Sequence, residues 1–161
     1  MIHIATHGFC ETVHTAQQVP ALKGLFRPLD LTGLVLSYGN SGWLNGSKEN
    51  HRGVVTASQI ADLNLQNTEL VVLSACFSGS GYIGQDGMYG LIRAFKKAGV
   101  GSILASLWEV DDKSSYFFMH TFYMALIVEG MSYRAAYEYA MSHTREDFPD
   151  PMYWAGYIFI D

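Results

Sequence analysis

Two residues that can do nucleophilic chemistry follow apolar runs of strand length. Cys76 comes directly after Glu69–Ala75, and His7 comes directly after Ile2–Thr6. In open parallel sheets, ligands sit outside the carboxyl ends of the strands. The separation of 69 residues between His7 and Cys76 leaves room for an intervening strand and loop. Both side chains are therefore expected at the same edge of the sheet, as a nucleophile and its base.

The pairing of a thiol with an imidazole has a chemical reason. The thiolate is the nucleophile, and an unperturbed cysteine with a pKa of about 8.5 is mostly protonated at neutral pH. A nearby imidazolium stabilises the thiolate and later protonates the leaving amine. Gly8 and the Ser78-Gly79 turn leave backbone amides free to approach a developing oxyanion, where losing one donor typically costs about 2.7–4 kcal/mol of barrier. The alternative is structural, since free cysteine is often buried and a histidine after a strand is often a satisfied structural group.

Strands alternate with helices along the chain, which predicts a largely parallel sheet covered on both faces. Residues 69–75 form a continuous apolar run, typical of a strand buried on both faces. Gly8 is expected to end the first strand, Thr56 to cap a short helix, and Gly99 to end another helix. Strands are predicted at 2–6, 34–37, 69–75, 102–107 and 153–160, helices at 57–62, 88–98, 112–129 and 132–145, and loops at 9–32 and 38–53.

The composition is that of one compact domain, 1–161. Of these residues, 49% are hydrophobic and 16% are charged, with a formal net charge of −5, which excludes a disordered chain. The longest basic run is Lys96-Lys97, so neither nucleic acid nor an anionic membrane is expected as a partner. The most apolar stretch, Tyr116–Val128, is far shorter than the roughly 20 residues of a membrane span. The two cysteines and the lack of a visible secretory signal predict a reducing cytoplasm.

Two other kinds of ligand, a dinucleotide and a metal ion, are also suggested by the sequence. Gly79–Gly84 has the spacing GxGxxG after a strand and before a helix, with Glu109 near the distance of a ribose-binding acid, which suggests a dinucleotide. Against it, the first glycine lies several residues beyond the strand, and Cys76 occupies the tight turn. A metal site is also suggested, because imidazole and thiolate are zinc ligands. The candidate ligands are His3, His7, Cys10 and His14, but their spacing matches no standard ligand pattern. His3 is expected instead to point into the site and orient its neighbours.

Aromatic side chains at helical spacing predict helix faces that pack on the sheet. The alternative is a partner-binding groove. The residues are Tyr116, Phe117, Phe122, Tyr123, Tyr133, Tyr137 and Tyr139.

Several sequence blocks, in order along nearly the whole chain, resemble the CHAT domain. This family belongs to the caspase-like cysteine peptidases, the clan of caspases, gingipains and separases, and is often fused to tetratricopeptide repeats. The blocks are HIATHGF at 3–9, ELVVLSACFSG at 69–79, DGMYGLIRAFKKAGVGSILASLWEVDD at 86–112, FY at 122–123 and PMYWAGYIFI at 151–160. The resemblance implies a caspase-like three-layer α/β/α sandwich with a mostly parallel sheet.

The resemblance also implies roles for individual residues. His7 and Cys76 match the family's dyad, and the amides of Gly8 and Cys76 match its oxyanion hole. The LWEVDD block resembles the separase motif in which an aspartate pairs with a P1 arginine, and Asp112 occupies that position. A carboxylate can accept a bidentate fork from a guanidinium. The alternative for Asp112 is a helix N-cap, and Asp111 is a weaker candidate for P1 binding.

The chain also departs from the family's pattern. Many relatives carry a polar residue at the position of Phe77, which is expected to narrow the pocket. They usually have Thr in place of Ser78 and Glu in place of Asp86. The strands and helix that precede the His-bearing strand in caspase-like folds have no counterpart, so 1–161 is expected to be the catalytic carboxyl-terminal portion of the domain. Ile2–Thr6 would then be an unprotected sheet edge. A second chain or a second copy in a homodimer is expected to complete it.

The function predicted from these residues is that of a cysteine endopeptidase. It would cleave a protein or peptide after a basic P1 residue, without a metal or organic cofactor, and would be inactive without a partner or upstream segment if one completes the fold. A tetratricopeptide-repeat protein or another regulator is an expected partner. The alternative is a catalytically silent CHAT module used for assembly in a signalling or defence complex.

Overall fold

Six strands form one sheet in the order β3-β2-β1-β4-β5-β6. The computed structural model describes residues 1–11, 28–37, 39, 53–76 and 87–161. The strands are β1 (Ile2–Cys10), β2 (Thr32–Val35), β3 (Val54–Thr56), β4 (Leu70–Cys76), β5 (Ser102–Ser106) and β6 (Tyr157–Ile160).

The central strands β1, β4 and β5 are mutually parallel, and antiparallel pairs flank them. β1 pairs with β4 from Ile2 opposite Val71 to His7 opposite Cys76. Four consecutive β4 side chains, from Leu70 to Leu73, have no exposed surface, as the unbroken apolar run predicts for a strand covered on both faces. The predicted class, a three-layer α/β/α fold with a mostly parallel sheet, is confirmed.

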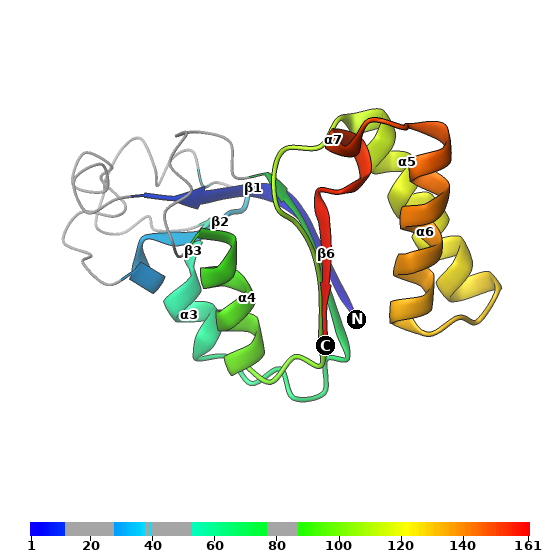
Figure 1. The fold of residues 1–161 in the computed structure, drawn as a ribbon. Coiled ribbons are helices and arrows are strands. Elements are labelled where there is room, and N and C mark those ends of the chain that lie inside the picture. Colours follow the sequence, from blue (N-terminus) through cyan, green and yellow to red (C-terminus); the bar gives the residue numbers. More distant parts are fainter. Residues whose placement is uncertain (12–27, 38, 40–52, 77–86) are drawn as a thin grey trace.

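Helices cover both faces of the sheet (Figure 1). On one face lie α3 (Ala57–Ala61) and α4 (Gly87–Lys97), preceded by the short 3-10 turn η2 (Pro28–Asp30). On the other face lie α5 (Asp112–Tyr123), the π-helical turn η3 (Met124–Val128) that continues it, and α6 (Tyr133–Asp147). The short α7 (Pro151–Trp154) connects α6 to β6.

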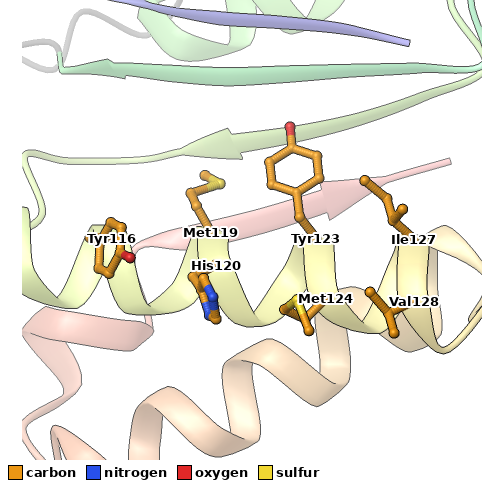
Figure 2. Close-up of a pocket in the computed structure, with 7 residues that line it drawn as sticks. All are labelled: Tyr116, Met119, His120, Tyr123, Met124, Ile127 and Val128. Carbon is orange, nitrogen blue, oxygen red and sulfur yellow. The ribbon is translucent and has the colours of Figure 1, made fainter.

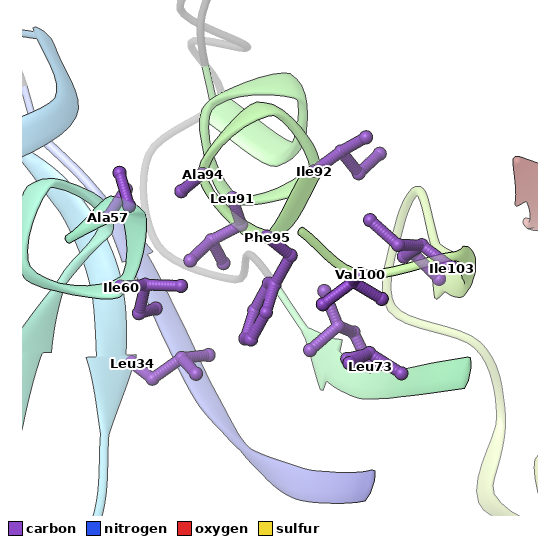
Figure 3. Close-up of a cluster of buried hydrophobic side chains, with 13 residues drawn as sticks. Leu34, Ala57, Ile60, Leu73, Leu91, Ile92, Ala94, Phe95, Val100 and Ile103 are labelled. Atoms are coloured by element: carbon purple, nitrogen blue, oxygen red, sulfur yellow. The ribbon is translucent and has the colours of Figure 1, made fainter. Parts of the chain in front are cut away.

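The core under α3 and α4 is aliphatic apart from Phe95. Leu73 and Ile103 point from β4 and β5 toward Leu91 and Phe95 of α4 (Figure 3). Ile2 and Ile4 of β1 pack against the margin of the same cluster. The even-numbered residues of β1 therefore belong to this face, as the two-residue period of a strand requires.

The core under α5 and α6 is built on aromatic rings. Phe118 and Phe122 are fully buried, and the Phe118 ring stacks on Tyr157 of β6, with centroids 3.8 Å apart. The Tyr157 hydroxyl donates to Ser115 Oγ at 2.9 Å, so the ring is buried with its polar atom satisfied. This contact ties α5 to the edge of the sheet.

Local capping accounts for several element boundaries. Thr56 accepts from the Gln59 amide while the Gln59 side chain accepts from the Thr56 amide, a complete capping box at the start of α3. Ser132 caps α6, and Gly99 follows α4 with a φ of 101°, where a side chain would be strained. The caps predicted at Thr56 and Gly99 are confirmed.

Two expectations about elements are wrong, and one strand was missed. β1 does not end at Gly8 but continues to Cys10, because Gly8–Cys10 pair with β2. Residues 153–160 are not one strand: Asp150 caps α7, Pro151 occupies its first turn, and β6 begins only at Tyr157. β3 was not predicted, since Val54–Thr56 is too short for a clear pattern.

The expected sheet edge is also corrected in part. β1 is not the edge strand, because β2 and β3 lie beyond it. The β2 pairing starts at His7, however, so in the described part of the chain Ile2–Thr6 pairs with β4 alone. The stretch that lacks a second neighbouring strand, Ile2–Thr6, is thus about half of the inner strand β1.

Some predictions concern residues outside the described ranges. They include most of the 9–32 and 38–53 loops and the GxGxxG stretch at 79–84. Among the helices that are described, none is long and apolar enough to cross a bilayer.

Two leucine-to-alanine substitutions test the core. Leu73 is fully buried and Leu63 is 51% exposed. Leu73→Ala is expected to lower the free energy of unfolding by about 2–5 kcal/mol because it leaves a cavity, whereas Leu63→Ala should change it by less than about 0.5 kcal/mol. Urea unfolding monitored by circular dichroism measures both. Equal losses in the two variants would contradict the assignment of Leu73 to the core.

Candidate active site at the carboxyl ends of the central strands

The register of β1 against β4 brings His7 opposite Cys76. Directly opposed residues of neighbouring strands share a face of the sheet and lie about 5 Å apart. His3 is on the same face of β1 as His7, since they are four residues apart, and it contacts α5. Positions 7 and 76 therefore fall on the α5 side of the sheet, at the carboxyl ends of two adjacent parallel strands. His7 is exposed there.

The backbone amide of Gly8 points toward the β4 side. The Glu11 amide donates to Leu31 O at 2.9 Å, and hydrogen-bonded pairs alternate along an antiparallel ladder. That alternation gives the next bonded pairs as Phe9–Gly33 and His7–Val35, with Gly8 between them. The Gly8 N–H thus turns away from β2, just beyond the last β1–β4 pair.

A third strand end lies beside these two. β5 follows β4 in the sheet and runs parallel to it, and residues 107–111 lead from its carboxyl end to α5. Asp111 caps α5, accepting from the amides of Lys113 at 3.0 Å and Ser114 at 3.2 Å. Asp112 is exposed in the first turn and is not the cap. The cap that the sequence suggested for Asp112 is thus formed by Asp111.

The segment that carries these aspartates is held at Trp108. The Trp108 Nε1–H donates to Met152 O at 3.0 Å. A Cβ on Gly156 would lie 2.9 Å from both the Trp108 ring and Val110 Cγ2, so only glycine fits beside the ring. α7 and β6 therefore fix the approach to α5.

His3 does not point into the site as expected. Four residues along a strand separate it from His7 by about 13 Å. Its Nδ1 lies 2.9 Å from the Tyr123 hydroxyl of α5. Partial desolvation lowers the pKa of His3 from 6.5 and raises the pKa of Tyr123 from 10.0. The pair couples β1 to α5 rather than supporting His7.

The residues considered for a metal do not converge in the described part of the chain. Cys10 is on the opposite face of β1 from His3 and His7, and Thr32 Oγ1 donates to its Sγ at 3.5 Å. No group of three or more metal-ligating side chains occurs among the described residues. His14, the Ser78-Gly79 turn and the departures at Phe77, Ser78 and Asp86 lie outside them.

A comparison with family models decides the classification. The model of the CHAT domain matches residues 1–161, the whole chain. The chain belongs to the CHAT domain family. The resemblance seen in the sequence blocks is thereby confirmed, and the family is related to the caspase-like peptidases.

This CHAT domain is also similar to two much longer proteins. It is 36% identical over 109 residues to tetratricopeptide repeat protein 28 of Mus musculus, and equally so to that of Homo sapiens. The match covers 66% of this chain but 4% of each relative. The CHAT domain therefore spans a small fraction of the length of these relatives.

Two features of the CHAT domain were not found from the sequence. The Asp111 cap was missed because Asp111 and Asp112 are adjacent and both suit a cap, and only backbone geometry distinguishes them. The His3–Tyr123 contact joins residues 120 positions apart in the sequence, so no local sequence pattern predicts it. The two-residue period of β1 gives only the face of His3.

The lowered pKa of His3 predicts a pH dependence of stability. The folded state favours neutral His3, so between its folded pKa and about 6.5 the unfolded chain binds more protons. Stability should therefore fall as the pH decreases through about 6.5, the value of the unfolded chain, and less so in His3→Gln. Urea unfolding at a series of pH values measures this. The same pH slope in both proteins would contradict the role assigned to His3.

Proposed function

We propose that this CHAT domain is a cysteine endopeptidase that cleaves after arginine or lysine. The observation that carries the proposal is the pairing of His7 with Cys76 across adjacent parallel strands, at their carboxyl ends. That edge is where open α/β sheets bind ligands. A thiol and an imidazole at neighbouring positions are the minimum for nucleophilic acyl transfer.

In the proposed reaction, His7 takes the Cys76 proton and the thiolate attacks the scissile carbonyl carbon. The amides of Gly8 and Cys76 stabilise the resulting oxyanion. His7 then gives its proton to the leaving amine, and the C–N bond breaks to leave a thioester on Cys76. Water, deprotonated by His7, attacks the thioester and releases the carboxylic acid and the free thiol. The Gly8 N–H turns away from β2, toward the β4 side, which supports its proposed role as an oxyanion donor.

Asp112 is proposed to recognise the basic P1 side chain, with Asp111 as the weaker candidate. Asp112 is exposed and Asp111 is engaged with two helix amides. A free carboxylate next to the third strand end can accept a bidentate guanidinium fork. Lysine would bind more weakly because its ammonium is a single-point donor.

The domain is further proposed to act with tetratricopeptide repeats, in the cytoplasm. The two relatives are named for such repeats, and the CHAT match is a small part of each. Thiols are kept reduced in the cytoplasm, where Cys76 would stay free of disulfides. The alternative, a catalytically silent assembly module, predicts binding without turnover.

Hydrolysis of fluorogenic peptides tests the proposal. The chain, alone and with a tetratricopeptide-repeat partner, is expected to cleave after Arg or Lys, and Cys76→Ala or His7→Ala should lower kcat/KM by about a thousandfold or more. Cys10→Ala and His3→Gln are the matched controls, since both lie away from the dyad, and each should retain activity. Absence of turnover on basic and acidic P1 series under both conditions would overturn the peptidase and leave the silent module.

Selectivity for P1 tests Asp112. Loss of a charge-assisted pair worth about 1.5–3 kcal/mol should lower kcat/KM on Arg substrates about 10- to 100-fold in Asp112→Asn, with little change on an uncharged P1 residue. Asp111→Asn is the matched control, because asparagine still caps a helix. Parallel losses on both substrates in Asp112→Asn would show that Asp112 does not bind P1.

A further inference from the structure

Position 108 lies in one row with the two positions proposed for catalysis. The described β4–β5 pairs run to Leu73 opposite Ala105. Three residues further along each strand, the same register puts position 108 level with position 76, which is itself opposite His7. Because neighbouring strands are about 4.8 Å apart, position 108 is expected on the order of 5 Å from position 76 and 10 Å from His7.

The β5–β6 ladder shows that the chain keeps its course to this level. The last β5–β6 pair is Ser106 opposite Tyr157. The Leu107 amide donates to Gly156 O at 2.6 Å, which is the next step of the same antiparallel ladder. Trp108 is therefore the first residue beyond the hydrogen-bonded end of the third parallel strand.

The indole of Trp108 is held at its polar edge and is partly open to solvent. Its Nε1–H donates to Met152 O at 3.0 Å, and a Cβ on Gly156 would lie only 3.0 Å from the same nitrogen. The side chain is nevertheless 39% exposed. Because the N–H is the one polar group of an indole and is bonded within the protein, the open surface offers carbon atoms to a ligand.

Met152 extends this apolar surface on α7. Its side chain is 54% exposed, while its carbonyl oxygen fixes the Trp108 ring. A rigid aromatic ring provides a large contact area at a low cost in conformational entropy. A methionine beside it adapts to the shape of the ligand. Together, the two side chains favour a large apolar group over a charged group or none.

The proposed chemistry decides which substrate residue meets this surface. His7 protonates the leaving amine, so the P1′ side of the substrate lies toward β1. The acyl side, with P1 and P2, then lies toward β5, on the other side of β4. P1 is assigned to Asp112, and successive side chains of an extended chain point in opposite directions at about 3.3 Å per residue. P2 is therefore the side chain left for Trp108.

A larger apolar surface lies along α5, but it leads away from Asp112 (Figure 2). Met119, Tyr123 and Ile127 line a hollow of about 390 Å³ and point toward the strands. At 1.5 Å per residue, Ile127 is about 20 Å further along the helix than Asp112. Tyr116, near the start of α5, is 73% exposed and thus is not part of the packed aromatic face that its spacing predicted. Most of this hollow is too far from Asp112 to receive the side chain next to P1.

We propose that Trp108 and Met152 form the P2 subsite of this CHAT domain and accept a large apolar side chain such as leucine or phenylalanine. The assignment rests on the proposed peptidase function and deepens it. The substrate class becomes peptides in which a large apolar residue directly precedes the basic P1 residue.

Peptides with arginine at P1 and leucine, phenylalanine, glycine or aspartate at P2 test the subsite. The chain is expected to cleave the leucine and phenylalanine peptides with a kcat/KM about tenfold above that of the glycine peptide, since one methylene in a closed apolar pocket already gives about 10- to 200-fold. Trp108→Ala should reduce this preference to about twofold or less, and circular dichroism checks its fold.

A charge introduced at Met152 gives a second test that leaves the Trp108 ring in place. Met152→Lys should shift the leucine-to-aspartate ratio of kcat/KM about 3- to 10-fold toward aspartate, because it removes apolar surface and adds a cation beside P2. Leu63→Lys is the matched control. Leu63 is 51% exposed and follows α3 on the other face of the sheet, so the same substitution there should leave the ratio unchanged.

Binding of the same peptides to Cys76→Ala, measured by fluorescence anisotropy, separates the subsite from the peptidase. If the native chain shows no turnover, the peptidase proposal fails, and the subsite still requires the leucine peptide to bind about tenfold more tightly than the glycine peptide. Equal binding would then overturn the subsite as well. Turnover without a P2 preference, or a preference that survives both Trp108→Ala and Met152→Lys, would overturn the subsite and leave the peptidase standing.

Discussion

The parallel pairing of β1 with β4 is the constraint on which the remainder of the structure depends. β1 is bonded to β4 over Ile2–His7 and to β2 over His7–Cys10, so His7 is the residue at which the two ladders meet. A slip of one residue would move every β1 side chain to the opposite face. It would take Ile2 and Ile4 out of the aliphatic core and His7 away from Cys76. The packing of the core and the geometry of the site are thus set by the same register.

The described helices cover the two faces of this sheet to different extents. Under α3 and α4, the aliphatic cluster reaches across β1, β4 and β5. On the other face, α5 and α6 cover β4 to β6, while His3, Ala5 and His7 of β1 stay exposed. The His3–Tyr123 contact is where the covered part of this face adjoins the open part. In the described structure, the positions proposed for catalysis, His7 and Cys76, therefore border an uncovered area beside α5.

Most of the fold could be predicted because its signals are local. The unbroken apolar run of β4 and the caps at Thr56 and Gly99 depend on neighbouring residues and were found. The extension of β1 beyond Gly8 depends on β2, whose pairing no local pattern encodes. For the site, the sequence selected His7 and Cys76 by type and position, and the register brings them opposite each other. The sequence could not show whether Asp111 or Asp112 caps α5, because the answer depends on the exact residue at which the helix begins.

The wide turn at the end of α5 has a consequence for how this segment can vary in evolution. A π turn holds about one residue more than an α turn over the same rise. Phe118, before the π turn, packs on Tyr157, whereas Ile127 and Val128, at the carboxyl-terminal end of the turn, are exposed. Loss of a single residue within Met124–Val128 would return the turn to α geometry with little rotation of the residues downstream, because the π turn accommodates the extra residue. A one-residue change in length can therefore be accommodated at this turn, whereas elsewhere in α5 it would rotate the downstream residues by about 100°.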